Sequence, residues 1–270
     1  MYLGGVAGGA LIRRRLRPKR QIEIRPNDPT SESLLSRNGD LEPAGVPAVS
    51  ARNLSCGYGR APVVEALSCH VHGGEALMIT GPNGAGKSTV LRTLAAQQPA
   101  LQGEVHLYDE RMVESSLLYR QRVSAVFDED AFLPGLSIGQ HLELVARGHM
   151  VVRPGETTRR ILHEFGLTDR IDASPYELSS GQRRRTLLAA AFVRPFSVLI
   201  LDEPEQRLDR EIRARLIKRL SYAREQGVAL LIATHDLDLA REVGTRHLHI
   251  GARNEWNLAE SIESHSEHLP

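Results

Sequence analysis

A glycine-rich stretch between an apolar run and a helical pattern constrains this chain more than any other feature. Residues 81–89 read GPNGAGKST, follow the apolar run ALMIT at 76–80 and open a helical pattern at 87–97. This matches G-x-x-x-x-G-K-[ST] in a strand–loop–helix context, where backbone N–H groups curl around phosphate oxygens that a Cβ would obstruct. A chance glycine-rich turn rarely combines these residues with this context. The stretch therefore predicts a nucleoside triphosphate site.

The residues of this loop have different expected tasks. Lys87 supplies a point charge to the β- and γ-phosphates, and the Ser88 hydroxyl suits Mg²⁺. The predicted nucleotide-binding residues of the loop are Gly81, Pro82, Asn83, Gly84, Ala85, Gly86, Lys87, Ser88 and Thr89.

Short apolar runs alternate with helical patterns from about residue 47 onward, which is typical of an α/β domain with a mainly parallel sheet. Strands are predicted at 76–80, 123–127, 198–201, 229–233 and 247–250. Helices are predicted at 87–97, 138–147, 157–165, 181–193, 209–226 and 236–243. Helices follow one another without a strand between 137 and 193, and this indicates a helical insertion in the α/β core.

Two of these strands end in residues that suit phosphate chemistry. The run SVLILDEP at 197–204 ends in Asp202 and Glu203, and the carboxyl ends of parallel strands meet at the ligand crevice. Asp202 suits a Mg²⁺ contact, and Glu203 suits a general base for the attacking water. His235 follows the strand at 229–233 in the same way, and it is predicted to hydrogen-bond the γ-phosphate or the water. A helix-capping histidine is the alternative interpretation.

The stretch ELSSGQRRR at 177–185 puts small and polar residues at the start of an apolar helix. A helix N-terminus has unpaired N–H groups and a partial positive charge, so it is a ready anion site. An ordinary serine cap is the commoner use of such a start. Taken alone, the stretch leaves both interpretations open.

Composition excludes several classes of function. The net charge of +1 gives no global argument for a nucleic-acid partner, and the two cysteines have neither metal-ligand nor redox spacing. The apolar residues 1–12 would reach roughly 18 Å as a helix, against a hydrocarbon core of roughly 30 Å. We expect residues 1–45 to be a disordered basic tail and linker, with membrane-surface contact as the weaker alternative, and residues 251–270 to be a C-terminal tail.

Taken in order, these motifs resemble the ATP-binding subunit of ATP-binding-cassette (ABC) transporters over about residues 46–250. GPNGAGKST resembles the family's Walker A motif, LILDEP its Walker B motif, LSSGQ its signature LSGGQ, and THD its switch-histidine loop. Tyr58 in CGYGR matches the aromatic residue that stacks on adenine, and Asp209 matches the D-loop aspartate. The order is specific, because other phosphate-loop ATPases lack a signature just before the second acidic strand.

The resemblance implies a phosphate-loop NTPase fold: a mainly parallel sheet, a small antiparallel β subdomain on the N-terminal side and a helical subdomain at about 129–193. It also implies that two cassettes pair head to tail and that each signature helix caps the γ-phosphate held by the other subunit. The signature residues expected to act in trans are Leu178, Ser179, Ser180, Gly181 and Gln182.

The same resemblance implies the partners and the location. ATP is the expected substrate and Mg²⁺ its cofactor. The expected protein partners are a second ATP-binding subunit and a separately encoded membrane permease, with no direct nucleic-acid contact. The chain is then cytoplasmic and peripheral, on the inner face of the cell membrane.

Several positions depart from the family's pattern. Ser180 replaces the first signature glycine, and Gln206 and Arg207 replace small residues of the D-loop. In VFDEDAFLPGLS at 126–137, the ending matches the segment after the Q-loop glutamine, which puts Asp128 at the glutamine position. In the family this loop ligates Mg²⁺ and passes the nucleotide state to the permease, so coupling is the function that the change concerns most. The predicted metal ligands are Ser88, Asp202 and Asp128.

The leading functional hypothesis is an ATPase subunit that powers a permease. The runner-up is a soluble ABC ATPase that remodels a protein or nucleic-acid complex, although neither a long coiled-coil insertion nor a second cassette is evident. A catalytically inactive binding module is disfavoured, because the expected catalytic set is complete. That set consists of Lys87, Asp202, Glu203 and His235.

Overall fold

The computed structural model describes residues 45–59, 61–129, 131–251 and 255–259. The predicted basic tail and linker therefore lie outside the described residues, except for Gly45. Among the described residues, the strands are β1 Val49–Tyr58, β2 Ala61–Val71, β3 Ala76–Thr80, β4 Gln102–Leu107, β5 Glu110–Arg111, β6 Val123–Val126, β7 Val198–Asp202, β8 Ala229–Ala233, β9 Arg246–Ile250 and β10 Trp256–Ala259. The α-helices there are α1 Lys87–Leu94, α2 Leu117–Arg122, α3 Ile138–Gly148, α4 Pro154–Glu164, α5 Ser180–Phe192, α6 Arg210–Glu225 and α7 Leu237–Val243.

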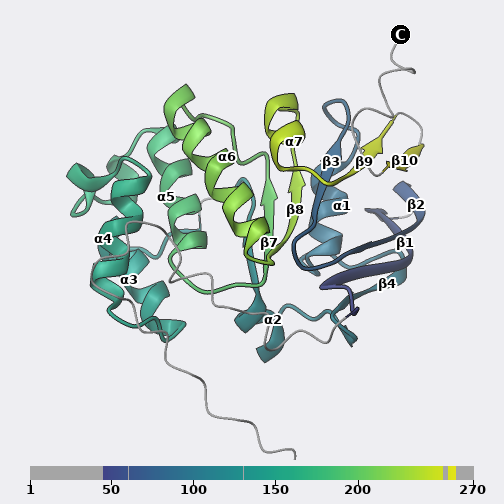
Figure 1. The fold of residues 1–270 in the computed structure, drawn as a ribbon, viewed down its shortest axis with the longest axis horizontal. Helices are drawn as coiled ribbons and strands as arrows, with labels where there is room; N and C mark the ends of the chain where they lie inside the picture. The colour runs from purple at the N-terminus through teal and green to yellow at the C-terminus, as the bar shows by residue number, and fades with distance from the viewer. Residues whose placement is uncertain (1–44, 60, 130, 252–254, 260–270) are drawn as a thin grey trace, which may run out of the picture.

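The strands form two sheets. One is antiparallel with the order β2-β1-β4-β5, and the other has the order β10-β9-β3-β8-β7-β6. In the second sheet β9, β3, β8, β7 and β6 are parallel, and β10 pairs antiparallel with β9. Figure 1 shows the antiparallel sheet at one end of the molecule, the parallel sheet in the middle, and α3 and α4 at the other end. The predicted fold class is confirmed, including the antiparallel subdomain and the helical insertion.

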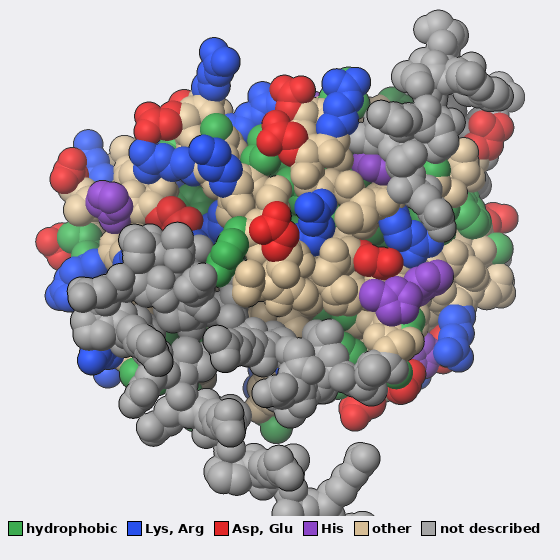
Figure 2. All heavy atoms as spheres, viewed as in Figure 1, with side chains coloured by type: hydrophobic (Ala, Val, Ile, Leu, Met, Phe, Trp, Pro, Cys, Tyr) green, Lys and Arg blue, Asp and Glu red, His purple; other side chains and the backbone are tan. Residues whose placement is uncertain are grey.

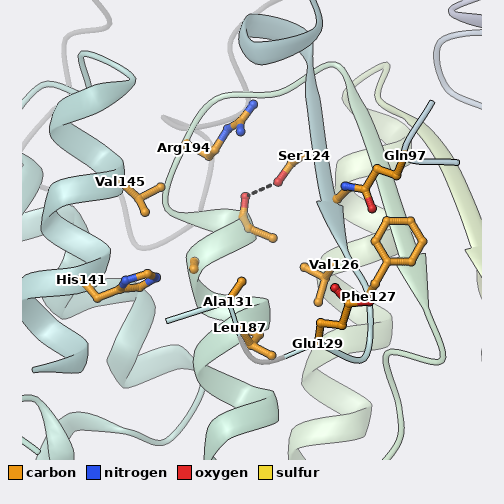
Figure 3. A pocket seen from close by; sticks show the side chains of 13 residues that line it. Gln97, Ser124, Val126, Phe127, Glu129, Ala131, His141, Val145, Leu187 and Arg194 are labelled. Atoms are coloured by element: carbon orange, nitrogen blue, oxygen red, sulfur yellow. Dashed lines mark hydrogen bonds between the residues drawn. The ribbon is translucent and has the colours of Figure 1, made fainter. Parts of the chain in front are cut away.

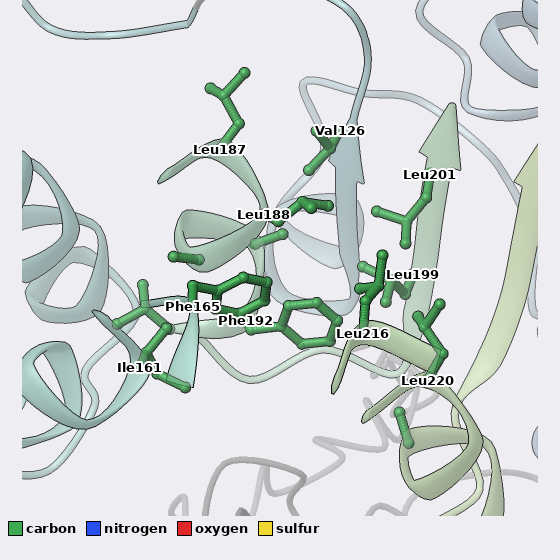
Figure 4. Close-up of a cluster of buried hydrophobic side chains, with 14 of the residues drawn as sticks. Val126, Ile161, Phe165, Leu187, Leu188, Phe192, Leu199, Leu201, Leu216 and Leu220 are labelled. Atoms are coloured by element: carbon green, nitrogen blue, oxygen red, sulfur yellow. The ribbon is translucent and has the colours of Figure 1, made fainter. Parts of the chain in front are cut away.

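The parallel sheet is covered on both faces, and its strands divide their side chains between two cores. Leu77 and Ile79 of β3 pack with α1 and the antiparallel sheet. Met78, between them in sequence, faces the opposite core, which includes side chains of α5, α6 and α7. Figure 4 shows this second core, where the rings of Phe165 and Phe192 stack at 5.8 Å. Burial on both faces explains why these strands appear in the sequence as continuous apolar runs.

The helical insertion consists of α3, α4 and α5 and is held to the core by an ion pair whose arginine is buried. Arg219 of α6 donates Nη1 to both carboxylate oxygens of Glu164 of α4, at 2.6 and 2.7 Å. Its guanidinium also lies 4.6 Å from the centre of the Phe192 ring. A paired and stacked arginine of this kind fixes two elements in one relative position. The start of α5 therefore has a fixed position relative to the core.

The predicted parallel strands and helices match the structure closely, whereas α2 and the individual strands of the antiparallel subdomain were not located in the sequence. In β1 the pairing register shifts between Ala51 and Leu54, and again further along, so no simple alternation of apolar residues survives. α1 ends before the predicted residue 97, because Ala96 has a φ of 54°. β10 extends the parallel sheet past residue 250, where the domain was expected to end.

The surface and the helices add two facts about the molecule as a whole. Figure 2 shows acidic and basic side chains mixed over the visible face, in line with the net charge of +1. In the described part of the chain, every helix is too short or too polar to cross a bilayer.

Candidate functional site

The loops that follow β3, β7 and β8 lie at one edge of the parallel sheet, because these neighbouring strands run in the same direction. The phosphate loop follows β3, Asp202 and Glu203 end and follow β7, and His235 comes two residues after β8. Asp202 lies opposite Ala233 in the β7–β8 register. The structure thus brings together the phosphate loop, the two acids and the histidine that the sequence predicted to share a site.

The phosphate loop needs glycine at two positions for definite steric reasons. Gly81 has a φ of 145°, and a Cβ there would lie 2.2 Å from a carbonyl oxygen of β9. Gly86 caps α1 with a φ of 100°, and a Cβ there would lie 2.8 Å from a valine side chain of β2. Lys87 follows at the start of α1, is 5% exposed, and donates its Nζ to the carbonyls of Gly81 and Pro82 at 3.1 and 3.2 Å. Its ammonium is therefore held over the loop that would receive the phosphates.

Ser88 and Asp202 form the part of the site that suits a metal. The Ser88 hydroxyl lies beside the Asp202 carboxylate, whose Oδ1 is buried and has no hydrogen-bond partner in the described part of the chain. Burial raises the pKa of Asp202, and the neighbouring Ser88 hydroxyl opposes that rise. A hydroxyl beside a carboxylate oxygen with unused lone pairs is a hard donor set of the kind Mg²⁺ prefers. These two residues therefore fit the predicted Mg²⁺ site.

Glu203 lies between a cation and an imidazole. Its Oε1 is 3.8 Å from the Nζ of Lys87 and 3.8 Å from the Nδ1 of His235, and the amide of Gln206 donates to its Oε2. Its backbone φ is 44°, a left-handed conformation that costs free energy in a residue with a side chain and that occurs at functional sites. The arrangement suits a carboxylate that accepts a proton from a water next to a phosphate.

A second carboxylate, Glu205, was missed in the sequence. It is 8% exposed; its Oε1 accepts a hydrogen bond from the Thr234 hydroxyl at 2.6 Å and lies 3.6 Å from the Nδ1 of His235. Burial raises the pKa of Glu205, and the hydroxyl bond opposes the rise. His235 therefore lies between Glu203 and Glu205. The available signal was a third acid just after the Asp-Glu-Pro turn, but nothing in the sequence showed that Glu205 is buried against His235.

The signature stretch forms a complete helix cap. Ser179 is the N-cap of α5: its Oγ accepts from the N–H of Gln182 at 3.2 Å, and the Gln182 Oε1 accepts from the N–H of Ser179 at 2.9 Å. This capping box engages the backbone N–H groups of Ser179 and Gln182. The N–H groups of Ser180 and Gly181 are the other two donors at the helix start. A Cβ at Gly181 would lie 2.6 Å from the carbonyl oxygen of Arg207, so glycine lets the D-loop segment approach the helix start.

Residues 127–129, here named the acidic loop, are contacted by arginines from different elements. Asp128 pairs with Arg207 at 3.4 Å, and both side chains are largely exposed. Glu129 pairs with Arg92 of α1 at 2.9 Å, and the Arg92 guanidinium lies 4.6 Å from the centre of the Phe127 ring. The sequence showed the negative charge of this loop but not its counter-charges, which come from distant positions. The predicted role of Asp128 as a metal ligand stays a prediction.

A cavity of about 240 Å³ opens beside the acidic loop, at the seam between the core and the helical insertion. Figure 3 shows Val126, Phe127 and Glu129 along one side of it and His141 and Leu187 along the other. The first group comes from β6 and the acidic loop, and the second from α3 and α5. A movement of Phe127 or Glu129 would therefore alter the shape of this cavity.

The remaining predicted site residues are either exposed, so that a ligand can reach them, or held in the fold by burial or hydrogen bonds. The Tyr58 side chain ends β1 and is 65% exposed, as stacking on a base requires. Asp209 caps α6 by accepting from the N–H of Ile212 at 2.9 Å. Leu178 and Thr89 are buried, Ala85 is half-buried, and the exposed residues of the loop and signature are Pro82, Asn83, Gly84, Ser88, Ser179 and Ser180.

The fold and this site together define a phosphate-loop ATPase, and comparison with known proteins identifies the family. The model of the ABC transporter family matches residues 64–206. The chain is 33% identical over 171 residues to the thiamine import ATP-binding protein ThiQ of Histophilus somni, covering 62% of this chain and 79% of that protein. It is 29% identical over 206 residues to the glutamate/aspartate import ATP-binding protein GltL of Escherichia coli, covering 73% and 85%.

Solved structures share the fold. The ATP-binding subunit of an ABC transporter superimposes with a TM-score of 0.70 at 24% identity, covering 80% of this chain and 91% of that one. A dimeric ATP-binding cassette in a post-hydrolysis state, bound to ADP and Pi, superimposes with a TM-score of 0.68 at 21% identity, covering 77% and 97%.

The chain belongs to the ABC transporter family. It is an ATP-binding and ATP-hydrolysing subunit that drives transport, as the leading hypothesis predicted. The alternative, a soluble ATPase that remodels complexes, is not favoured by these relatives.

Proposed function

We propose that this chain works as one half of a head-to-tail pair of ATP-binding subunits, peripheral on the inner face of the cell membrane, and powers a separately encoded permease. The supporting observation is the convergence of Lys87, Asp202, Glu203 and His235 at one edge of the sheet. Relatives named as import proteins favour an import system. The ATP-binding domain of this proposal begins near residue 46 and includes β10.

In the proposed reaction the phosphate loop and its lysine act first. The Lys87 ammonium exchanges two neutral carbonyls for the β- and γ-phosphates, because charged acceptors make stronger hydrogen bonds. Ser88 and Asp202 would hold Mg²⁺, which when bound neutralises charge on the phosphates. Glu203 takes a proton from the attacking water, and His235 hydrogen-bonds the γ-phosphate or that water. Tyr58 stacks on adenine.

The signature helix acts on the nucleotide of the second subunit. The N–H groups of Ser180 and Gly181 lie at the positive end of α5, beside the Ser179 cap, where an anion is stabilised. Ser179 and Ser180 are exposed, so a second subunit can reach them. Capping the partner's γ-phosphate makes closure of the pair depend on ATP, so hydrolysis opens it again. Asp209 belongs to the same proposed interface.

The acidic loop connects this cycle to the permease. It borders both the D-loop segment, through the Asp128–Arg207 pair, and the cavity between the core and the helical insertion. We propose that Asp128 ligates Mg²⁺ when the nucleotide is bound and that Arg207 continues to screen its charge. The permease then contacts the rim of the cavity and senses whether Asp128 holds the metal.

Two inactive variants test the pairing of subunits. Ser179→Arg places a bulky cation at the signature and spares the phosphate loop, whereas Lys87→Ala disables the phosphate loop and spares the signature. Neither variant alone should hydrolyse ATP. A mixed dimer assembles one intact site from both chains, so an equal mixture should regain about a quarter of wild-type activity with random pairing of independent sites.

The control variants distinguish a disrupted subunit interface from a misfolded chain. Ser179→Arg should bind ATP as a monomer with wild-type affinity, and Ser179→Thr should retain activity because threonine also caps helices. A mixture that stays inactive, or a Ser179→Arg monomer that no longer binds ATP, would place the signature in its own subunit's site. Purification of the tagged chain from membranes should bring a multi-span protein with it; its absence would count against the permease.

A further inference from the structure

Arg184 is a buried cation on the signature helix whose task the proposed function leaves open. It is 3% exposed, and its guanidinium donates to three main-chain carbonyls. Nη1 donates to the carbonyl of Phe127 at 2.9 Å, while Nη2 donates to the carbonyl of Glu203 at 3.0 Å and to that of Asp202. One side chain thus joins α5, the first residue of the acidic loop and the catalytic end of β7.

The guanidinium suits this bridging geometry, and nearby carboxylates compensate its charge in part. The N–H groups of its planar guanidinium can donate to carbonyls of two chain segments at once, which the single ammonium of a lysine does less well. Burial lowers the pKa of Arg184, but the negative charges of Asp128, Asp202 and Glu205 oppose that change. A buried arginine held in this way is costly to lose, because the hydrogen bonds that it donates to the Phe127 and Asp202 carbonyls would be left unmade.

The carbonyl of Glu203 matters because its backbone conformation is strained. Glu203 has a φ of 44°, and its two flanking peptide groups are both fixed. Its N–H donates to the carbonyl of Ala233 at 2.7 Å, and its carbonyl accepts from Arg184 at 3.0 Å and from the N–H of Gln206 at 3.1 Å. Strained conformations persist only where neighbouring groups determine them. With both peptides fixed, the Glu203 carboxylate stays within 3.8 Å of Lys87 and of His235.

We infer that Arg184 is a positioning residue that holds Glu203 in its left-handed conformation and transmits the displacement of Glu203 to the acidic loop. A shift of the Glu203 peptide on ATP binding pulls on the guanidinium, and the guanidinium pulls on the Phe127 carbonyl. The start of α5 moves with the same side chain. This inference rests on the proposed function, since it gives the connection between the reacting end of β7 and the loop beside the cavity.

The variants are chosen to separate positioning from simple packing. Arg184→Gln removes the charge and the fork but retains an amide donor, and Arg184→Lys retains the charge with a different donor geometry. The matched control is Arg185→Gln on the same helix, because Arg185 also donates to main-chain carbonyls, those of Phe165 and Gly166, away from the reacting groups.

The first measurement is steady-state ATP hydrolysis together with ATP binding. Arg184→Gln should bind ATP within about threefold of wild type and lose about 10- to 100-fold in kcat, as expected when a catalytic group is displaced by a fraction of an ångström to one ångström. Arg184→Lys should recover part of kcat. Arg185→Gln should match wild type in both quantities.

The second measurement reports on the segment that follows the acidic loop in the chain. Burial raises the pKa of Cys56 to about 11 and that of Cys69 to about 12, so a cysteine introduced at the exposed Leu133 can be labelled selectively with an environment-sensitive fluorophore. ATP with Mg²⁺ should change the fluorescence of the labelled chain. In the Arg184→Gln background, ATP should still bind while the fluorescence change is lost.

Three outcomes would overturn the inference. They are an unchanged kcat and fluorescence response in Arg184→Gln, equal losses in Arg184→Gln and Arg185→Gln, and a kcat loss that matches a loss of ATP affinity. If Arg184→Gln does not fold, Arg184→Lys decides: reduced kcat and reduced response support positioning, and wild-type values refute it. A wild-type chain without ATP hydrolysis would instead refute the proposed function.

Discussion

Removal of the Arg207 charge should raise the Mg²⁺ concentration needed for ATP binding. Asp128 is an anion close to the site of a triphosphate, so it repels ATP unless a cation screens it. Arg207 lies 3.4 Å from Asp128 and provides that screening. In Arg207→Ala, Mg²⁺ has to provide more of the screening of the Asp128 charge. In Asp128→Gln the repulsion is gone, so the Mg²⁺ requirement should fall and ATPase activity without a partner should rise.

The size of the effect follows from the exposure of the pair. The side chains of Asp128 and Arg207 are 60% and 48% exposed. Coulomb's law in water gives about 1 kcal/mol at this distance, and exposed pairs measure about 0.2–1 kcal/mol. That corresponds to a factor of about 1.4 to 5 in a binding constant. Arg207→Ala should therefore raise the Mg²⁺ midpoint by about 1.4- to 5-fold.

The assay is a Mg²⁺ titration of ATP binding at low ionic strength, followed by a fluorescent nucleotide. The double variant Asp128→Gln/Arg207→Ala should match Asp128→Gln, because Arg207 acts only through Asp128 in this reasoning. Arg147→Ala is the control, since Arg147 is an exposed arginine paired with Glu143 on α3. An equal shift of the midpoint by Arg207→Ala with and without Asp128, or superimposable Asp128→Gln and wild-type curves, would show that the charge of Asp128 does not set the Mg²⁺ requirement.

Two further predictions concern the carboxylates around His235. Glu203→Gln should retain ATP binding, lose about 10²–10⁴-fold in turnover and accumulate as an ATP-bound dimer on size exclusion with Mg²⁺; wild-type turnover would remove Glu203 from the mechanism. Glu205→Gln should be more stable than wild type at pH 8, because burial raises the pKa of Glu205 and its charged form therefore disfavours folding, while the amide oxygen still accepts from Thr234. The stability that protonated Glu205 gives wild type below the ordinary pKa of 4.5 is lost as pH rises through the folded-state pKa. The difference in melting temperature between Glu205→Gln and wild type should therefore close toward pH 4.5. A difference that does not depend on pH would contradict this.

Local sequence patterns predicted the elements of the parallel core, because strands buried on both faces and a glycine-rich phosphate loop leave strong signals. The capping box of Ser179 and Gln182 is equally local, since its two residues are three positions apart. The resemblance implied the antiparallel sheet, but its strands were not located in the sequence because bulges interrupt the alternation of apolar residues. The missed contacts of the site are long-range: Arg184 and the Phe127 carbonyl are 57 positions apart, and Thr234 and Glu205 are 29 apart.

The structure also changes the meaning of two departures from the family's pattern. The Q-loop glutamine is replaced by Asp128 and a small D-loop residue by Arg207, and in the fold these two side chains pair with each other. An ionised carboxylate cannot donate a hydrogen bond as an amide can, but it attracts a cation strongly. Glu129 is paired with Arg92 on the helix that follows the phosphate loop. The connection between the acidic loop and the nucleotide motifs therefore relies on charge, and salt should weaken it where its pairs are exposed.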